Sequence, residues 1–170
     1  MFQKTVLNNG LRVITCHMPH TRSVSVVLAV GAGSRYESDK EAGAFHFVEH
    51  LLFKGTKNRP DVESISGAIE NVGGFINATT DKEITMLICS VTPSHFSLSM
   101  EFLFDMVKNP LLDKDELDKE RSVILEELAL TRDRPDYRVD LLMDKILWPD
   151  HPLGRDVGGE EDSVKKLDRD

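Results

Sequence analysis

Polar side chains interrupt an otherwise apolar stretch at residues 41–54. Residues 46–50, where the polar side chains occur, have the sequence His-Phe-Val-Glu-His. The apolar side chains around them recur at helical spacing, and Gly55 is a typical residue to end such a helix. Two imidazoles four positions apart lie one turn apart on the same face of a helix. Because buried imidazole and carboxylate groups without partners destabilise a helix, the fold must supply a partner for this face. A bound metal ion is the partner that this arrangement favours.

The spacing of these polar residues suits a zinc site. His46 and His50 can share one zinc ion at the usual Zn–N distance of roughly 2.0–2.1 Å. Glu49 lies on nearly the same face, so it can take a proton from a water that the metal activates without being a ligand itself. This order of residues is the inverted form of the thermolysin-like metallopeptidase motif. Catalytic zinc sites usually have three protein ligands, so a third must come from elsewhere in the chain.

The helix predicted at residues 113–132 offers that third ligand. Glu120 and Glu127 lie two turns apart on one face, and apolar neighbours on the same face predict that it points inward. Glu126 lies about 100° further round the helix, and we expect it in solvent. Spacing alone does not rank Glu120 against Glu127.

Strand-like and helix-like hydropathy patterns follow one another along the chain. The strand-like segments are residues 2–7 and 11–17, which the turn Asn8-Asn9-Gly10 joins as a hairpin, and residues 23–31, 75–79 and 83–91. The helical segments are residues 41–54, 62–72, 95–108, 113–132 and 136–148, with N-caps expected at Asp61 and Ser94; the pattern from residue 149 on is irregular. This order predicts an α+β fold of two layers, a mostly antiparallel sheet with helices packed on one face.

Composition narrows the function classes. A net charge of −8 disfavours nucleic-acid binding, because the phosphate backbone would be repelled. The first residues lack a signal-peptide pattern, and no run reaches the roughly 18 apolar residues of a membrane helix, so we expect a cytoplasmic protein without a membrane partner. Cys16 and Cys89 both lie in strand-like runs, which predicts buried free thiols in a reducing compartment.

Several segments share a family resemblance. The run from His46 to Thr56 is accompanied by residues 33–37, 70–80, 120–127 and 151–155, and together these segments span nearly the whole chain. They resemble the pitrilysin/insulinase family of zinc metallopeptidases, which includes mitochondrial processing peptidase and its bacterial relatives. The resemblance implies that residues 1–170 are the N-terminal zinc-binding domain of a larger protein built from two halves. We therefore expect an incomplete domain here, with the processing-peptidase-like fold.

The resemblance also assigns roles to residues. It implies that Glu127 is the third ligand of one Zn²⁺ per chain, and that Glu120 supports catalysis beside the site without binding zinc. Asn77 and Ala78 fall where the family's edge strand pairs with an extended peptide substrate. The implied activity is a zinc-dependent endopeptidase acting on extended peptides or presequences, with Glu49 as the general base.

The resemblance further implies partners and leaves two alternatives. Family members pair two homologous halves, so we expect the C-terminal half of the same protein or a second subunit, as in a dimer, and weak activity of this chain alone. One alternative is S-ribosylhomocysteine lyase, a metalloenzyme with a similar inverted motif, which would need Cys89 as the third ligand. The other is a catalytically inactive family subunit with a structural or regulatory role.

Overall fold

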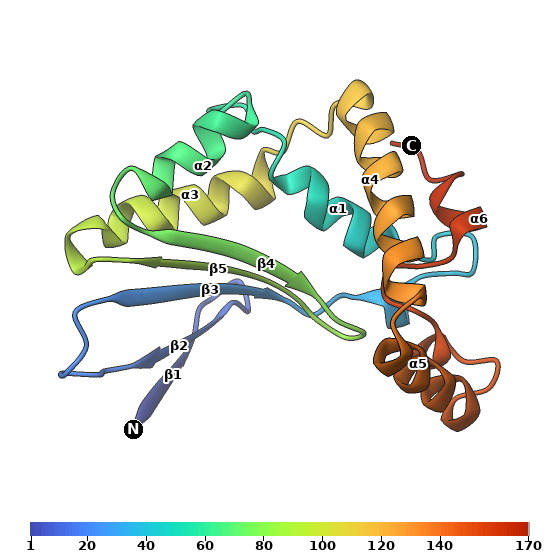
Figure 1. Ribbon diagram of the computed structural model, residues 1–170. Helices are drawn as coiled ribbons and strands as arrows, with labels where there is room; N and C mark the ends of the chain where they lie inside the picture. Colours follow the sequence, from blue (N-terminus) through green and yellow to red (C-terminus); the bar gives the residue numbers. More distant parts are fainter. Residues whose placement is uncertain (170) are drawn as a thin grey trace.

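A three-stranded antiparallel sheet carries helices on one face (Figure 1). Its strands β3 (Val24–Val30), β5 (Thr85–Val91) and β4 (Phe75–Thr80) lie in the order β3-β5-β4 in this computed structural model, which describes residues 1–169. The central strand β5 pairs with both neighbours, with Cys89 opposite Val26 on one side and Ile76 on the other. The predicted α+β architecture with helices on one face of an antiparallel sheet is confirmed.

The first two strands form a sheet of their own. β1 (Phe2–Val6) and β2 (Arg12–Cys16) pair as the predicted hairpin, and Gly10 in the turn takes a positive φ of 86°. Every residue of both strands is exposed, because the hairpin does not join the larger sheet. The expectation of two buried thiols is therefore wrong for Cys16, which is exposed, and right for Cys89.

Six helices lie within residues 1–169, and the first five follow the predicted pattern with differences at their ends. They are α1 (Ala44–Leu52), α2 (Val62–Glu70), α3 (Phe96–Lys108), α4 (Lys114–Arg132), α5 (Pro135–Leu147) and α6 (Glu161–Val164). The short α6 lies in the region that we expected to be irregular. Asp61 caps α2 as predicted, through a reciprocal capping box with Ser64. The predicted cap at Ser94 is wrong, because Ser94 lies inside a 3-10 turn, η2 (Pro93–His95), and α3 begins after it.

Helix α1 begins at Ala44, three residues later than predicted. Its N-cap, Gly43, has a φ of 93° and lies against the backbone of Gly158, where a Cβ atom would be 2.5 Å from the carbonyl oxygen. Only glycine fits both the positive φ and the close approach. The start of α1 is therefore set by a tertiary contact with a distant loop.

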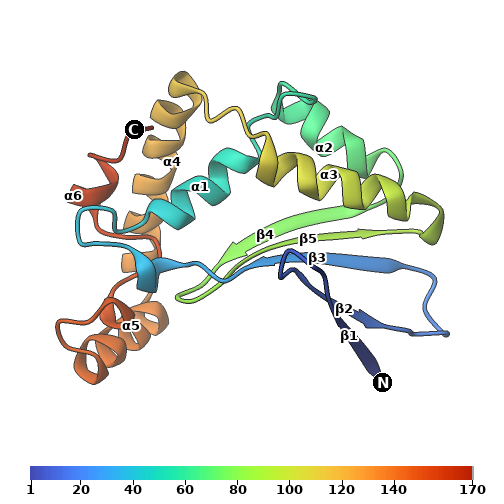
Figure 2. The same cartoon turned by 180° about the vertical axis from the view of Figure 1, so that it is seen from behind.

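Two hydrophobic cores meet at α1. The first lies between the sheet and helices α2 and α3, and α1 contributes Leu52 to it. The second packs Phe47 and Leu51 of α1 against Ile124 of α4 and Val164 of α6. Figures 1 and 2 show α4 crossing near one end of α1, with α6 beside it. Because burial of one such side chain contributes about 1.5–3 kcal/mol, the two cores fix α1 against both α4 and the sheet.

Within residues 1–169, no helix combines the length and the apolar character that crossing a bilayer requires.

Candidate functional site

Three side chains from α1 and α4 converge on one point, the ligand point. One ligand atom each of His46, His50 and Glu127 lies within 4.8 Å of the other two. Glu127 Oε2 is 3.9 Å from Nε2 of His46 and 3.6 Å from Nε2 of His50. These separations are longer than hydrogen bonds and close to the about 3.4 Å between two ligands of a tetrahedral zinc ion.

The donor set fits zinc. Two imidazole nitrogens and one carboxylate make up a known catalytic zinc set that leaves a fourth position open. Burial lowers the pKa of His46 and the charge of His50 lowers it further, whereas Glu127, Glu49 and Asp156 act in the opposite direction. The net lowering favours a neutral His46, which is the form that binds a metal.

Glu120 occupies a second position on the same face of α4. Its Oε2 lies 3.0 Å from Nδ1 of His50, and its Oε1 forms a 2.6 Å ion pair with Nζ of Lys54. Burial raises the pKa of Glu120, but the hydrogen bonds from Lys54 and His50 outweigh burial and hold its pKa below the ordinary value. Glu120 therefore contacts the back of a candidate ligand and stays ionised.

The two glutamates differ in exposure. The side chain of Glu127 is 47% exposed, whereas that of Glu120 is 8% exposed, so the inward direction predicted for both holds only for Glu120. Glu126 is exposed, as predicted.

Glu49 contacts the end of the sheet strand β4. Its Oε2 accepts a 2.5 Å hydrogen bond from Oγ1 of Thr80, the last residue of β4. Thr80 closes the segment 70–80 that shares the family resemblance, but neither the pattern nor the resemblance gave it a role. A hydroxyl on a distant strand gives no periodic signal, and only the folded arrangement of α1 beside β4 places it there.

Glu37 is a second residue that sequence reasoning passed over. Its two carboxylate oxygens accept hydrogen bonds of 2.8 Å from the backbone N–H groups of Gly43 and Phe45, at the start of α1. The backbone oxygen of Glu37 accepts in turn from Arg155. Because the first N–H groups of a helix lack partners within it, Glu37 fixes the end of the helix that carries His46. The only signal was its place in the segment 33–37 that carries the family resemblance.

Asn77 and Ala78 lie on the edge strand β4. β4 pairs only with β5 among the described strands, so its outer edge has no neighbouring strand. Ala78 is buried in the first core, whereas the neighbouring Asn77 is exposed and points to the opposite face. Any contact that Ala78 makes with a peptide would therefore come from its backbone.

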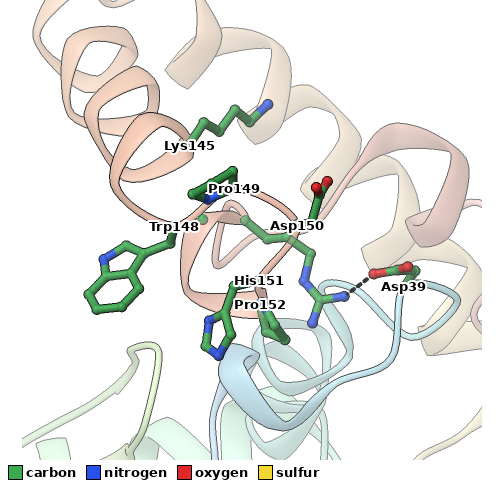
Figure 3. A pocket seen from close by; sticks show the side chains of 9 residues that line it. Asp39, Lys145, Trp148, Pro149, Asp150, His151 and Pro152 are labelled. Atoms are coloured by element: carbon green, nitrogen blue, oxygen red, sulfur yellow. Dashed lines mark hydrogen bonds and ion pairs between the residues drawn. The ribbon is translucent and has the colours of Figure 1, made fainter.

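A cavity of about 480 Å³ lies apart from the convergent group, where α5 ends. Figure 3 shows Lys145, Trp148 and His151 around it. Asp39, which also lines this cavity, forms an ion pair of 2.6 Å with Arg155. None of the predicted site residues lines this cavity. Cys89 also stands apart, because it is buried in the first core and does not belong to the convergent group. The lyase alternative therefore lacks its third ligand.

The chain matches a known family over most of its length. The sequence pattern described as Insulinase (Peptidase family M16) matches residues 12–161. A protein of Mycobacterium leprae named as a zinc protease is 43% identical over 98% of this chain. The zinc protease YmxG of Bacillus subtilis is 33% identical over the full chain. The chain spans 37% and 41% of the length of these two relatives.

Solved structures show the same fold. A protease from Helicobacter pylori superposes with a TM-score of 0.92 at 25% identity, covering 99% of this chain and 41% of that one. Pitrilysin gives a TM-score of 0.82 at 28% identity, covering 96% of this chain and 18% of that one. A peptidase M16 inactive domain from Pseudomonas fluorescens, at 18% identity, a TM-score of 0.87 and coverage of 99% and 41%, shares the fold alone.

Proposed function

This chain belongs to the insulinase family, peptidase family M16, and on that premise we propose that it binds one zinc ion through His46, His50 and Glu127 and hydrolyses peptide bonds. The observation that carries the proposal is the convergence of these three ligand atoms within 4.8 Å of one another. The relatives named as zinc proteases support the same activity class.

The proposed reaction divides the work between the metal and Glu49. A bound zinc ion supplies Lewis-acid catalysis: it polarises the scissile carbonyl and makes water acidic near neutral pH. Glu49 receives the proton of the attacking water and passes it to the leaving amine. The hydrogen bond from Thr80 holds the Glu49 carboxylate beside the end of β4, where the peptide is expected.

The proposed substrate is an extended peptide that lies along the open edge of β4. An edge strand presents N–H and C=O groups that can hold a peptide backbone whatever its side chains. Asn77 and the backbone of Ala78 would take part in this pairing. Thr80, on the same strand, donates a hydrogen bond to Glu49. A peptide in this place would pass near the convergent group, which suits an endopeptidase for extended peptides or presequences.

The relatives are much longer than this chain, so the full peptidase activity is expected to need a further part of the protein. Because the chain spans about two fifths of the two relatives, we propose that a second half, in the same protein or in a second subunit, completes the substrate site. The groups that stabilise the developing oxyanion would come from that half. In its absence, we expect this chain to bind zinc and to cleave peptides weakly.

Two measurements on the purified protein test the proposal. We expect elemental analysis to find one zinc per chain, and digestion of a peptide library to give cleavage that Glu49→Gln abolishes. A protein that binds zinc but cleaves no peptide, even with its second half present, would instead be a catalytically inactive family subunit. A protein without zinc would contradict the proposal altogether.

A further inference from the structure

We propose that Asp156 is a positioning residue for His46, the carboxylate that accepts the Nδ1–H of this imidazole when zinc is bound. The inference rests on the proposed zinc site and extends it to a residue outside α1 and α4. Asp156 lies in the loop between η3 (Pro152–Gly154) and α6. Three observations carry the proposal: an unpartnered nitrogen, an unpartnered oxygen, and a glycine that lies beside both residues.

The unpartnered nitrogen is Nδ1 of His46. The other ring nitrogen, Nε2, faces Glu127 and the ligand point. Nδ1 is buried and has no hydrogen-bond partner within residues 1–169. A metal-ligating histidine ordinarily donates its second N–H to a carboxylate, a carbonyl or a water, which fixes the ring orientation and raises the basicity of the ligand. An orphaned Nδ1 at this position therefore indicates that a partner must be near.

The unpartnered oxygen is Oδ2 of Asp156, a residue that is only 2% exposed. Its other oxygen, Oδ1, accepts hydrogen bonds from the hydroxyl of Tyr137 at 2.6 Å and from the backbone N–H of Gly158 at 3.0 Å. Oδ2 is buried, and the part of the chain that the structure describes offers it no partner. A carboxylate held so firmly by one oxygen presents the other in a fixed direction.

Gly158 lies beside both residues. A Cβ atom at Gly158 would lie 3.6 Å from Nδ1 of His46 and 3.6 Å from Oδ1 of Asp156. Both side chains therefore flank the same small residue, and the Asp156 charge acts on the His46 ring. The absent side chain leaves room for the imidazole and the carboxylate to approach each other as the ring settles on a metal.

The arrangement repeats that of the other histidine. His50 has Glu120 behind it, and Lys54 holds Glu120 in place. His46 has Asp156 behind it, and Tyr137 holds Asp156 in place. Each candidate histidine ligand thus has its own anchored carboxylate, which is the usual second layer of a histidine–zinc site.

Asp156→Asn tests the proposal with little change in volume. The Gly158 N–H keeps the amide oxygen at the Oδ1 position, so an NH₂ group takes the place of the free oxygen. Two hydrogen-bond donors, this NH₂ group and the Nδ1–H of His46, would then face each other. We expect zinc affinity, measured by competition with a chromophoric chelator, to fall about 10- to 100-fold. The matched control is Asp162→Asn, which makes the same change at an exposed position on α6. This variant should have the zinc affinity of the wild type.

Imidazole ¹⁵N NMR of the zinc-loaded protein separates positioning from a general loss of structure. Asp156→Asn should move the Nδ1 resonance of His46 and leave that of His50 in place, and Glu120→Gln should do the reverse. Zinc affinity within twofold of the wild type, with unchanged His46 resonances, would overturn the inference.

Two further outcomes keep the test decisive. Should Asp156→Asn fail to fold, Tyr137→Phe frees the carboxylate from its anchor, and we expect a several-fold loss of zinc affinity with the same His46-specific shift. Tyr137→Phe without either effect would overturn the inference. If the wild type itself binds no zinc, the proposed function fails and this inference fails with it, whereas zinc binding that Asp156→Asn leaves intact defeats the inference alone.

Discussion

Nδ1 of His50 lies 3.0 Å from Oε2 of Glu120, a buried carboxylate that Lys54 also holds. The contact joins α1 to α4 directly behind the ring nitrogen that faces Glu127. The helix that offers the third ligand thus also orients one of the other two.

Glu120→Gln should weaken zinc binding without removing a ligand. The amide is uncharged, so it loses the ion pair with Lys54 and the electrostatic attraction to His50. The His50 ring then lacks the partner that orients it. We expect zinc affinity to fall about 10- to 100-fold in a chelator competition assay. Glu126→Gln, the same change at an exposed position on the same helix, should leave affinity unchanged. Equal affinities for the two variants would refute a positioning role for Glu120.

Glu49→Gln should separate metal binding from catalysis. Glutamine keeps the shape of the side chain but cannot take a proton, so turnover of a peptide substrate should fall by a factor of about 10²–10⁴. Zinc content should remain one per chain, because Glu49 is not among the convergent ligands. Loss of zinc in this variant would show that Glu49 binds the metal.

Thr80→Val should lower the turnover number while zinc content stays the same. Valine matches threonine in shape but removes the hydroxyl that donates to Glu49. A hydrogen bond to a charged group contributes about 1.5–3 kcal/mol, so we expect a loss of about tenfold or more in kcat. Thr80→Ser restores the donor and should recover most of the rate. Failure of serine to rescue would mean that the valine variant acts through packing.

The ionised carboxylate of Asp105 should stabilise the fold at neutral pH and lose this effect in acid. This residue, 4% exposed, accepts hydrogen bonds from Thr56, Asn58, Arg59 and Asn109, which ties the loop after α1 to α3. Asp105→Asn removes the charge that faces Arg59 inside the protein and should lower the free energy of unfolding by about 3 kcal/mol at neutral pH, measured with urea.

The pH dependence of that difference follows from the pKa of Asp105. Burial raises this pKa, but the hydrogen bonds and the charge of Arg59 outweigh burial and hold it below the ordinary value of 3.8. The ionised carboxylate therefore stabilises the fold fully above that value, and its contribution is lost as the pH falls through the lower pKa of the folded state. The difference between the wild type and Asp105→Asn should stay constant at neutral pH and narrow below about pH 3.8. A difference that widens in acid would contradict this account.

Local patterns predicted the fold better than they predicted the site. Helical periodicity and caps such as Asp61 depend on residues close in sequence, so the helices and strands were predictable except at their ends. The start of α1 depends on contact with Gly158, far along the chain, and α6 has only four residues, too few for a periodic signal.

The site itself depends on how α4 lies across α1. Spacing placed Glu120 and Glu127 on one face but could not say which of them meets the ligand point and which meets the back of His50. Other elements also contribute side chains around the site. Thr80 donates to Glu49, which is 31 residues away, and Glu37 accepts from backbone groups 6 and 8 residues away. The proposed partner of His46, Asp156, lies in a loop far along the chain. Such contacts leave no periodic trace in the sequence.

The most direct test is the zinc content of the purified protein and of Glu127→Ala, after dialysis at a fixed free zinc concentration, with Glu126→Ala as the control. We predict one zinc per chain in the wild type and the control, and a large loss in Glu127→Ala. Stoichiometric zinc in Glu127→Ala, or none in the wild type, would contradict the assignment of His46, His50 and Glu127 as the metal ligands.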